Sequence, residues 1–536
     1  MPRRRVAWLV LAVLVSVAFA MPAKAVPEPW ASRWRADLAY CADSLPRAHP
    51  NFFHSVSRDA YRAALDSLRR RVPDLDHDEI IVELARIVAL VGDGHTRLTL
   101  PFDKAAGFFT GHATTAAPKI PDLVFRHYPI RVGLFANMLF VIRTDAAHRG
   151  LLGGRVVAIG RRSVAEAMAA IEPTVHRDND SQVRDLLPSW LVVPEILHAR
   201  GVVPDMEHAT IVVEGPHGRV TETLAPVAIG APVTWVDARV AGEPPLRERV
   251  PGRAHWFTLM PDGRTVYARY RSVMDDSSES VSRFVDSLFA AFERSGADRL
   301  VLDARGNVGG DGFLNRPLVR RLIRTERVWK PGALWALVDR GTFSAAVMLA
   351  ADLEMRTPAI LAGEKTGGHP NSYGDSKRVV LPNTGLTVRV SSLYWQLTSP
   401  QDKSDGIEPQ VPVVTQFTDW RANRDPVLDA ALARGGAGDV AGVWTGTIAW
   451  TFLRLPVQLT VERGGRGSSG TISIAAAGVD AAPLVDIVLG SEGIAAGFGA
   501  AADPWRFETV LAGERLVGIV HNAGNDLPIV LQRKPK

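Results

Sequence analysis

The chain has 536 residues, of which 46% are hydrophobic and 22% charged, and it contains 46 Gly, 36 Pro and a single Cys. This composition is that of a globular protein, which excludes collagen, coiled coils and disorder, and the length predicts about three domains. The single cysteine excludes an intramolecular disulfide framework and any zinc site built on cysteines.

The first 25 residues are typical of a secretory signal peptide. Arg3 to Arg5 precede an uncharged stretch from Val6 to Ala20, and Ala23-Lys24-Ala25 is a small-x-small cleavage site. The apolar run is shorter than the ~20 residues of a membrane-spanning helix. Cleavage after Ala25 removes four of the 62 basic residues and leaves 58 against 57 acidic ones. We therefore expect an exported, periplasmic or extracellular protein that binds no nucleic acid and keeps no membrane span. An uncleaved anchor, a cut after Ala20 and a twin-arginine route stay open.

Residues 26–115 are predicted to form an N-terminal helical region. Apolar residues recur at spacings of three and four from Tyr61 to Val72 and again from Ile80 to Val91. Asp76-His77-Asp78-Glu79 supplies a cap and an acidic first turn for the second of these helices.

Residues 116–245 are predicted to form a β-rich insertion. Short apolar runs alternate with turns that contain Gly and Pro. We expect strands at Leu139–Ile142, Arg155–Ile159 and Ala209–Val213, and one short helix at Val164–Ile171.

Residues 246–433 alternate between strand and helix patterns, which predicts an α/β core with a sheet covered on its faces. The strands are expected at Thr265–Tyr270, Arg299–Asp303, Leu334–Val338 and Ala359–Ala362, and the helices at Val281–Phe292, Ser344–Met355 and Asp425–Ala433. Residues 434–441 are typical of a glycine-rich linker. Residues 442–536 are predicted to form a small β-barrel or sandwich, to which we assign no chemistry.

Three segments carry residues that are suited to chemistry. In Leu90–Leu98 a helix ends in Gly-Asp-Gly and presents His95 on a turn, from which it can reach a cleft. In Asp303–Gly312 the glycines after a buried strand let backbone N–H groups approach a ligand and donate to an oxyanion. In Asp339–Ala346 Ser344 lies at a strand-to-helix junction, where the helix N-terminus favours developing negative charge.

Each segment also has a plainer interpretation: a surface or capping histidine, a flexible glycine turn and an N-cap serine. The glycine spacing matches neither a dinucleotide fingerprint nor a P-loop, and Ser344 is not in a Gly-x-Ser-x-Gly elbow. Together, however, the segments supply a nucleophile, a base and oxyanion donors, the components of acyl transfer. No histidines or carboxylates have metal-ligand spacing, so we expect neither a metal nor another cofactor.

In this order the three motifs resemble the C-terminal-processing (tail-specific) serine peptidases, and the resemblance covers about Trp30 to Ala433. It implies a ClpP/crotonase-like α/β peptidase core with a β-rich or PDZ-like insertion, and a peptide or protein substrate. Ser344 would be the nucleophile. The oxyanion hole would consist of the N–H groups of Gly309, Gly310 and Ala345.

The family has a Ser–Lys branch and a Ser–His branch. Lys365 lies inside the run Gly363-Glu364-Lys365-Thr366-Gly367-Gly368, and the position of the catalytic lysine is held by His369. The resemblance therefore favours the Ser–His branch, which includes the tricorn core, with His95 as general base.

A third group should orient the imidazole of His95. In the Ser–His relatives this is a Glu three residues before the Gly of a Gly-Ile-x-Pro segment, and here Lys403 holds that position before Gly406-Ile407-Glu408-Pro409. Asp405 is the first candidate for the acid and Asp402 the second. An acid from elsewhere in the chain stays open.

The segment Leu151–Gly160 resembles the carboxylate-binding half of a PDZ-like module, which would hold a peptide by its C-terminus. The alternative is an insertion that only shields the cleft. Two other functions stay open: a carrier of an apolar ligand on the same fold, as in the interphotoreceptor retinoid-binding proteins, and a hydrolase of small esters or amides. Because a carrier has no need of Ser, His and Gly-Gly together, we favour a serine endopeptidase.

Overall fold

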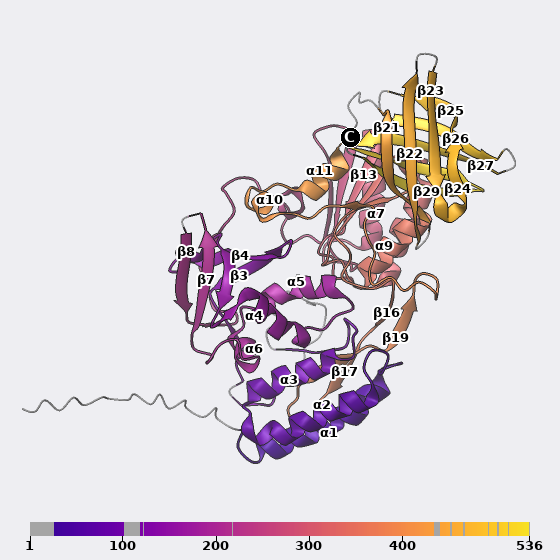
Figure 1. Ribbon diagram of the computed structural model, residues 1–536. Coiled ribbons are helices and arrows are strands. Elements are labelled where there is room, and N and C mark those ends of the chain that lie inside the picture. The colour runs from indigo at the N-terminus through magenta and orange to yellow at the C-terminus, as the bar shows by residue number, and fades with distance from the viewer. Residues whose placement is uncertain are drawn as a thin grey trace, which may run out of the picture.

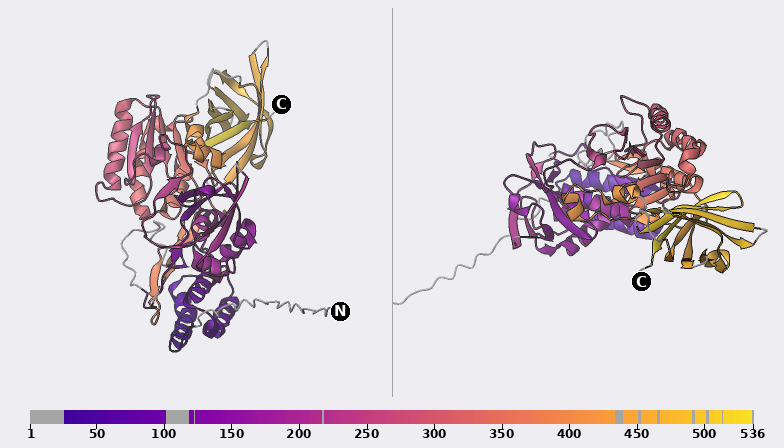
Figure 2. Two further views of the ribbon diagram at one scale, coloured as in Figure 1. Left: turned by 90° about the vertical axis from the view of Figure 1, so that its left-hand side faces the viewer. Right: turned by 90° about the horizontal axis from the view of Figure 1, so that it is seen from above.

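Figure 1 shows a computed structural model of the chain, which describes residues 26–100, 118–121, 123–216, 218–433, 440–450, 453–464, 467–490, 493–500, 503–512 and 514–534. The predicted signal peptide and most of the predicted linker lie outside these residues. The N-terminal helices lie at one end of the molecule, and the α/β core and the C-terminal sheet lie side by side at the other (Figures 1 and 2).

Within residues 26–100 the chain forms the predicted helices, which are α1 (Trp30–Ala48), α2 (Arg58–Arg71) and α3 (His77–Ala89). The cap predicted for α3 is confirmed as a capping box. The Asp76 carboxylate accepts from Glu79 N at 2.8 Å, and the Glu79 carboxylate accepts from Asp76 N at 3.0 Å. The apolar face of α3 is buried from Ile80 to Val88, which anchors the turn that follows the helix.

The next region is built on a sheet with strand order β10-β4-β5-β7-β8, to which β3 adds along β4 and β6 along β5. The predicted strands and the predicted helix α4 are confirmed. Helices α5 and α6 are absent from the prediction, because Pro188 interrupts the pattern of α5 and α6 has only six residues. The elements are β2 (Arg126–His127), β3 (Ile130–Phe135), β4 (Met138–Asp145), β5 (Arg155–Ile159), β6 (Arg162–Ser163), α4 (Val164–Ile171), α5 (Asp180–Trp190), α6 (Pro194–Ala199), β7 (Ala209–Gly215), β8 (Gly218–Leu224), β9 (Val227–Ala228) and β10 (Trp235–Asp237).

The α/β core contains a six-stranded sheet with the order β11-β12-β13-β14-β15-β20. In this sheet β12, β13, β14, β15 and β20 are parallel, and β11 joins the edge antiparallel to β12. Because the parallel strands point the same way, the loops after β13 and β14 emerge at one edge of the sheet. The elements are β11 (His255–Leu259), β12 (Thr265–Tyr270), α7 (Val281–Ser295), β13 (Arg299–Asp303), α8 (Arg316–Arg324), β14 (Leu334–Val338), α9 (Ala345–Arg356), β15 (Ile360–Gly363), β20 (Val411–Pro412), α10 (Phe417–Arg421) and α11 (Pro426–Leu432).

Both faces of this core sheet are buried. One face packs against α7, α8 and α9 in a cluster that includes Phe284 and Leu349. The other face packs against α11 and the C-terminal sheet, because Val517 and Val530 lie in one cluster with Trp335. The C-terminal sheet therefore covers a face of the α/β core, and the two regions share apolar surface.

The predicted all-β character of the C-terminal region is confirmed by a nine-stranded antiparallel sheet. Neighbours along the chain pair with each other, the first strand β21 pairs with the last strand β29, and the ladder ends at β24 and β25. This is the connectivity of an up-and-down barrel with one seam. The strands are β21 (Gly442–Trp450), β22 (Leu453–Gly464), β23 (Gly467–Ile474), β24 (Val479–Pro483), β25 (Val485–Leu489), β26 (Gly493–Ala500), β27 (Asp503–Ala512), β28 (Arg515–Asn522) and β29 (Asn525–Arg533).

Two small sheets join the N-terminal region to the core. Strand β1 (Arg97–Leu98) pairs with β18 (Thr387–Val390), which also pairs with β17 (Lys377–Val380). Strand β16 (Asn371–Gly374) pairs with β19 (Leu393–Gln396), and both lie between the core and the N-terminal helices (Figure 1). These pairings place the turn that follows α3 beside the loops of the core sheet.

Candidate active site

Ser344 lies in the turn between β14 and α9. Its backbone has φ 55° and ψ −126°, a strained conformation for a residue with a side chain. The serine precedes the first residue of α9, but its side chain makes no capping hydrogen bond. The plainer interpretation of Ser344 as an N-cap is therefore wrong. A strained strand-to-helix turn is the local geometry that exposes the nucleophilic serine of the α/β-hydrolases.

His95 meets Ser344 although 249 positions separate them in the sequence. Its Nε2 lies 2.9 Å from the Ser344 Oγ, and its ring stacks on Phe343 with 4.5 Å between centroids. Burial lowers the pKa of His95 to about 4, against the opposing charges of Asp93 and Asp375. The imidazole is therefore neutral at pH 7, so Nε2 can accept the serine proton.

The glycine loop after β13 lies directly against the Ser344 turn. A Cβ on Gly309 would come within 2.7 Å of the Ser344 Cβ, and a Cβ on Gly310 within 2.1 Å of the Val273 carbonyl oxygen. The two glycines have φ values of 98° and 144°, which other residues rarely adopt. Phe343 N–H also donates to Asn307 O at 2.9 Å. The glycines therefore serve the close packing of the two loops.

The oxyanion donors differ in part from the prediction. Gly309 N–H donates to the side-chain oxygen of Asn307 at 2.9 Å, so it is not available to a substrate, and its predicted role is wrong. Gly310 N–H has no hydrogen-bond acceptor among the described residues. Ala345 N–H is the first of α9, where no intrahelical acceptor exists. Gly310 and Ala345 border the same cavity as Ser344.

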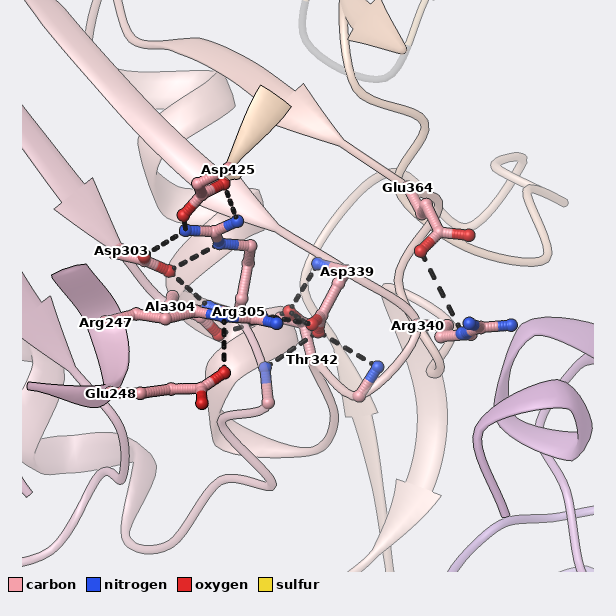
Figure 3. Close-up of polar contacts among 12 residues, drawn as sticks. Arg247, Glu248, Asp303, Ala304, Arg305, Asp339, Arg340, Thr342, Glu364 and Asp425 are labelled. Atoms are coloured by element: carbon pink, nitrogen blue, oxygen red, sulfur yellow. Dashed lines mark hydrogen bonds and ion pairs between the residues drawn. The ribbon is translucent and has the colours of Figure 1, made fainter. Parts of the chain in front are cut away.

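Asp339, the residue after β14, joins the glycine loop to the Ser344 turn (Figure 3). Its carboxylate accepts from Gly306 N at 2.7 Å and from Gly341 N at 3.0 Å. Thr342 Oγ1 donates to Ala304 O at 3.2 Å and ties the same two loops a second time. The positions of both loops are therefore set by polar groups at the end of the sheet, of which Thr342 is buried and Asp339 partly exposed.

Arg305 anchors the start of the glycine loop between two carboxylates (Figure 3). Its guanidinium donates to Asp303 Oδ1 at 2.9 Å and to Asp425 Oδ1 at 2.7 Å, and Asp425 caps α11. Burial acts to raise the pKa of Asp303, but Arg305 and Arg269 outweigh it and hold that pKa well below its usual value. The charged cluster ties the end of β13 to α11.

The two predicted acids do not reach His95. The Asp405 carboxylate accepts from Lys365 Nζ at 2.9 Å. The Asp402 carboxylate accepts from Thr398 Oγ1 at 2.6 Å and from Ser404 N at 2.9 Å. Neither Asp405 nor Asp402 binds the imidazole of His95 in this structure, so both predictions of the third group are wrong. Nδ1 of His95 is buried and binds no side chain among the described residues.

The amine of Lys365 also binds groups other than Ser344. Its Nζ lies 2.9 Å from Asp405 and 3.6 Å from Glu408. Lys365 does not border the cavity that holds Ser344, whereas His369 does. The amine of Lys365 is therefore paired with carboxylates outside that cavity.

A cavity of about 1330 Å³ opens over Ser344 and His95. This volume exceeds the ~300–1,000 Å³ of typical small-ligand pockets, so it has room for several residues of an extended chain. Part of its wall is apolar or aromatic, from Met274, Phe313, Met348, Trp395 and Leu397.

The part of the chain that the structure describes has no cluster of three or more His, Cys, Asp or Glu that could bind a metal ion. None of the helices in that same part is long and apolar enough to span a membrane.

The PDZ-like segment does not offer an open carboxylate nest. The N–H groups of Leu152, Gly153 and Gly154 donate at 2.9–3.1 Å to the carbonyl oxygens of Arg149, Val141 and Leu151. Because these donors are already used, they cannot bind the C-terminus of a peptide in this conformation. The expectation that this loop holds a substrate by its C-terminus is therefore wrong for the structure as it stands.

Two residues missing from the sequence prediction contact the His95 turn. Asp93 accepts from His95 N at 2.9 Å and from Thr96 N at 2.7 Å. Asp178 accepts from Gly94 N at 2.6 Å, and burial raises its pKa to about 7. The position of Asp93, two residues before a histidine in a glycine turn, is the one sequence signal that could have identified it.

No family model matches the sequence, and no curated protein matches it. Solved structures do match. A mutant of CPAF is 12% identical with a TM-score of 0.51, over 75% of this chain and 96% of that chain. Mature CPAF complexed with lactacystin is also 12% identical with a TM-score of 0.50, over 73% of this chain and 95% of that chain. The photosystem II D1 C-terminal processing protease is 16% identical with a TM-score of 0.33, over 71% of this chain and 92% of that chain.

The chain therefore has a fold of mixed helices and sheets similar to that of CPAF, and it also has a β-rich C-terminal region. The three sequence motifs resemble the C-terminal-processing serine peptidases, and the comparison with CPAF adds the likeness in fold.

Proposed function

We propose that the protein is an exported serine endopeptidase that cleaves peptide bonds through an acyl-enzyme on Ser344, with His95 as general base. The contact of 2.9 Å between Ser344 Oγ and His95 Nε2 carries this proposal. The strained backbone of Ser344 and the absence of a capping bond from its side chain support it, because a purely structural serine needs neither.

The residues have defined roles in this reaction. His95 Nε2 takes the proton as Ser344 Oγ attacks the scissile carbonyl, and it returns the proton to the leaving amine. The oxyanion of the tetrahedral intermediate would accept from Gly310 N–H and Ala345 N–H. The N-terminal end of α9 adds a partial positive charge at the same place. Water, activated by His95, would then release the acyl group from Ser344.

A fluorophosphonate probe tests the nucleophile and the base. We expect the wild type to be labelled, and Ser344→Ala and His95→Ala to remain unlabelled while their circular dichroism stays that of the wild type. Ser372→Ala and His369→Ala are matched controls, because both residues border the same cavity. Both controls should keep the label. Loss of labelling in His369→Ala with retention in His95→Ala would assign the base to His369 instead.

The substrate class needs a second assay. We expect the wild type to cleave internal bonds in a mixture of peptides derived from a proteome, as detected by mass spectrometry of new termini. Turnover of p-nitrophenyl acetate without any peptide cleavage would replace the peptidase proposal with that of a small-ester hydrolase. A folded wild type that neither labels nor turns over any of these compounds would favour a carrier of apolar ligands.

Export rests on the pattern of the first 25 residues. Expression of the full chain in a bacterium, followed by fractionation and N-terminal sequencing, tests it. We expect a periplasmic or secreted product that begins at Val26. A cytoplasmic product that retains Met1 would overturn this part of the proposal.

A further inference from the structure

Nδ1 of His95 is buried and binds no side chain among the described residues, and apart from Ser344 at Nε2 only the main chain of Tyr373 acts on the ring as a hydrogen-bond partner. Two residues before His95, the Asp93 carboxylate has several partners. The predicted acids Asp405 and Asp402 bind other groups. If Ser344 and His95 act as proposed, the imidazole still needs to be positioned, and its charged form needs to be stabilised.

Asp93 is a buried acid that binds the main chain of the His95 turn. Its Oδ1 accepts from His95 N at 2.9 Å and from Thr96 N at 2.7 Å, and also from Ser391 Oγ at 2.7 Å. Ser391 follows β18, so the carboxylate ties the turn after α3 to the sheet that joins the core. Burial acts to raise the pKa of Asp93, but the hydrogen bonds from His49, Thr96 and Ser391 outweigh it and lower that pKa to about 2.

The fourth bond to Asp93 comes from His49, the residue that follows α1. His49 Nε2 lies 3.0 Å from Asp93 Oδ2, and His49 Nδ1 accepts from Asn51 N at 3.0 Å. Because Nδ1 accepts, the ring proton of a neutral His49 must lie on Nε2, which then donates to Asp93. The His49 ring is buried against Tyr373 of β16, with 4.7 Å between centroids. Both ring nitrogens of His49 are therefore engaged, and Nε2 faces the Asp93 carboxylate.

We infer that Asp93, held by His49, is the positioning residue for His95, and that it takes the place of a triad acid by binding the main chain of the His95 turn instead of Nδ1. This inference rests on the proposed function of Ser344 and His95. Four donors orient the carboxylate, and two of them belong to the turn that carries the imidazole.

Other charged groups also face His95 and have to be separated from Asp93 in a test. After burial, the influences on the His95 pKa are Asp93, which raises it, Arg97, which lowers it, and Asp375, which raises it. The main chain of Tyr373 also acts to raise the pKa, and His176 lies close enough to interact with His95. Asp375 is exposed, and its carboxylate accepts from Trp395 Nε1 at 2.6 Å. Its charge is therefore better screened than that of Asp93.

The test compares Asp93→Asn with Asp375→Asn, each in the full chain. The Asp93→Asn variant keeps a side-chain oxygen that can accept from the His95 turn. It loses the negative charge and presents an amide group to His49 Nε2. We expect kcat/KM of peptide cleavage to fall about tenfold or more at pH 7 and its acidic limb to move to lower pH. The change in Asp375→Asn should be smaller. The His95 titration, followed by NMR of histidine labelled with ¹³C at Cε1 and assigned with His95→Gln, should move the same way.

Two variants of His49 keep the inference testable if Asp93→Asn fails to fold. His49→Gln retains a donor near the position of Nε2, whereas His49→Phe retains the aromatic packing and removes the donor. We expect His49→Phe to lower kcat/KM and His49→Gln to restore most of it.

An unchanged His95 titration in Asp93→Asn, or a larger change in Asp375→Asn, would overturn the inference. A wild type that cleaves nothing, with a His95 titration that still moves in Asp93→Asn, would overturn only the proposed function.

Discussion

Lys365 Nζ binds the carboxylate of Asp405 at 2.9 Å, so the alternative base and the first candidate acid are paired with each other. Lys365 follows β15 and Asp405 precedes β20, and the pair lies outside the cavity that holds Ser344 and His95. An ion pair of this kind stabilises the loop before Gly406 and leaves the chemistry to other groups.

Lys365→Ala should therefore keep substantial activity. The Asp405 side chain is exposed and that of Lys365 partly so, so loss of the pair should cost at most about 1 kcal/mol of unfolding free energy. The measurement is kcat/KM together with the melting temperature, with Asp405→Ala beside it. A large loss of activity in Lys365→Ala at an unchanged melting temperature would move the site to the Ser–Lys branch.

Gly309→Ala should remove activity, because its Cβ would meet Ser344 Cβ at 2.7 Å and Ala345 N at 2.8 Å. We expect a loss of about 2–4 kcal/mol in unfolding free energy and little fluorophosphonate labelling. Gly306→Ala is the matched control. Its φ of 62° is also positive, but a Cβ there meets nothing within 4 Å, so it should cost only about 1–2 kcal/mol. Equal losses of labelling in both variants would contradict a role for close packing at Ser344.

The pH dependence of cleavage should report the low pKa of His95. Burial lowers this pKa to about 4, so the base is neutral above that pH, and kcat/KM should stay level from neutrality down to about pH 5. It should then fall about tenfold per pH unit as His95 becomes protonated. An acidic limb near the ordinary histidine pKa of about 6.5 would show that the imidazole is not buried as described.

The same pKa has a consequence for stability. The unfolded chain binds a proton at His95 near pH 6.5, whereas the folded chain does so only near pH 4. The contribution of neutral His95 is therefore fully present above pH 6.5 and declines as the pH falls towards 4. The difference between the unfolding free energies of the wild type and His95→Gln, measured with urea at several pH values, should shrink over this interval.

The C-terminal sheet should be required for a folded core. Val517 is fully buried in the cluster that contains Trp335 of the core sheet. Val517→Asp would place an unpaired charge there, and we expect unfolding or a loss of several kcal/mol. Val488→Asp is the control, because that side chain is 60% exposed, and it should change the melting temperature little. A chain truncated after Ala433 that stays monomeric and active would contradict this structural role.

The sequence predicts the elements of the core well, because their patterns are local. Strand β13 begins and ends at the predicted residues, and so does helix α4. The apolar run of a fully buried strand and the capping residues of a helix each lie within a short stretch of chain, where the sequence pattern shows them. Helix α5 is not predicted, because Pro188 interrupts its helical sequence pattern. In the folded chain the packing of the helix compensates for this interruption.

The sequence predicts residues of the site only where they lie in a motif whose residue types indicate a chemistry. Ser344 and His95 are singled out by the segments that carry them, and the structure places them 2.9 Å apart. The predicted donor Gly309 fails because Asn307, two residues earlier, folds back to take its N–H. The predicted acid Asp405 fails because Lys365, forty positions away, takes its carboxylate.

The sequence by itself therefore determined the order of elements and singled out Ser344 and His95, since these depend on residues close together in the chain. Only the tertiary structure decided which groups serve them. Asp93 meets His49 and Ser391 through contacts over 44 and 298 positions, and Val517 covers the sheet of Trp335 from the far end of the chain. Hydrogen bonds and apolar contacts act over a few ångströms of space, and the distance along the chain does not enter their energies.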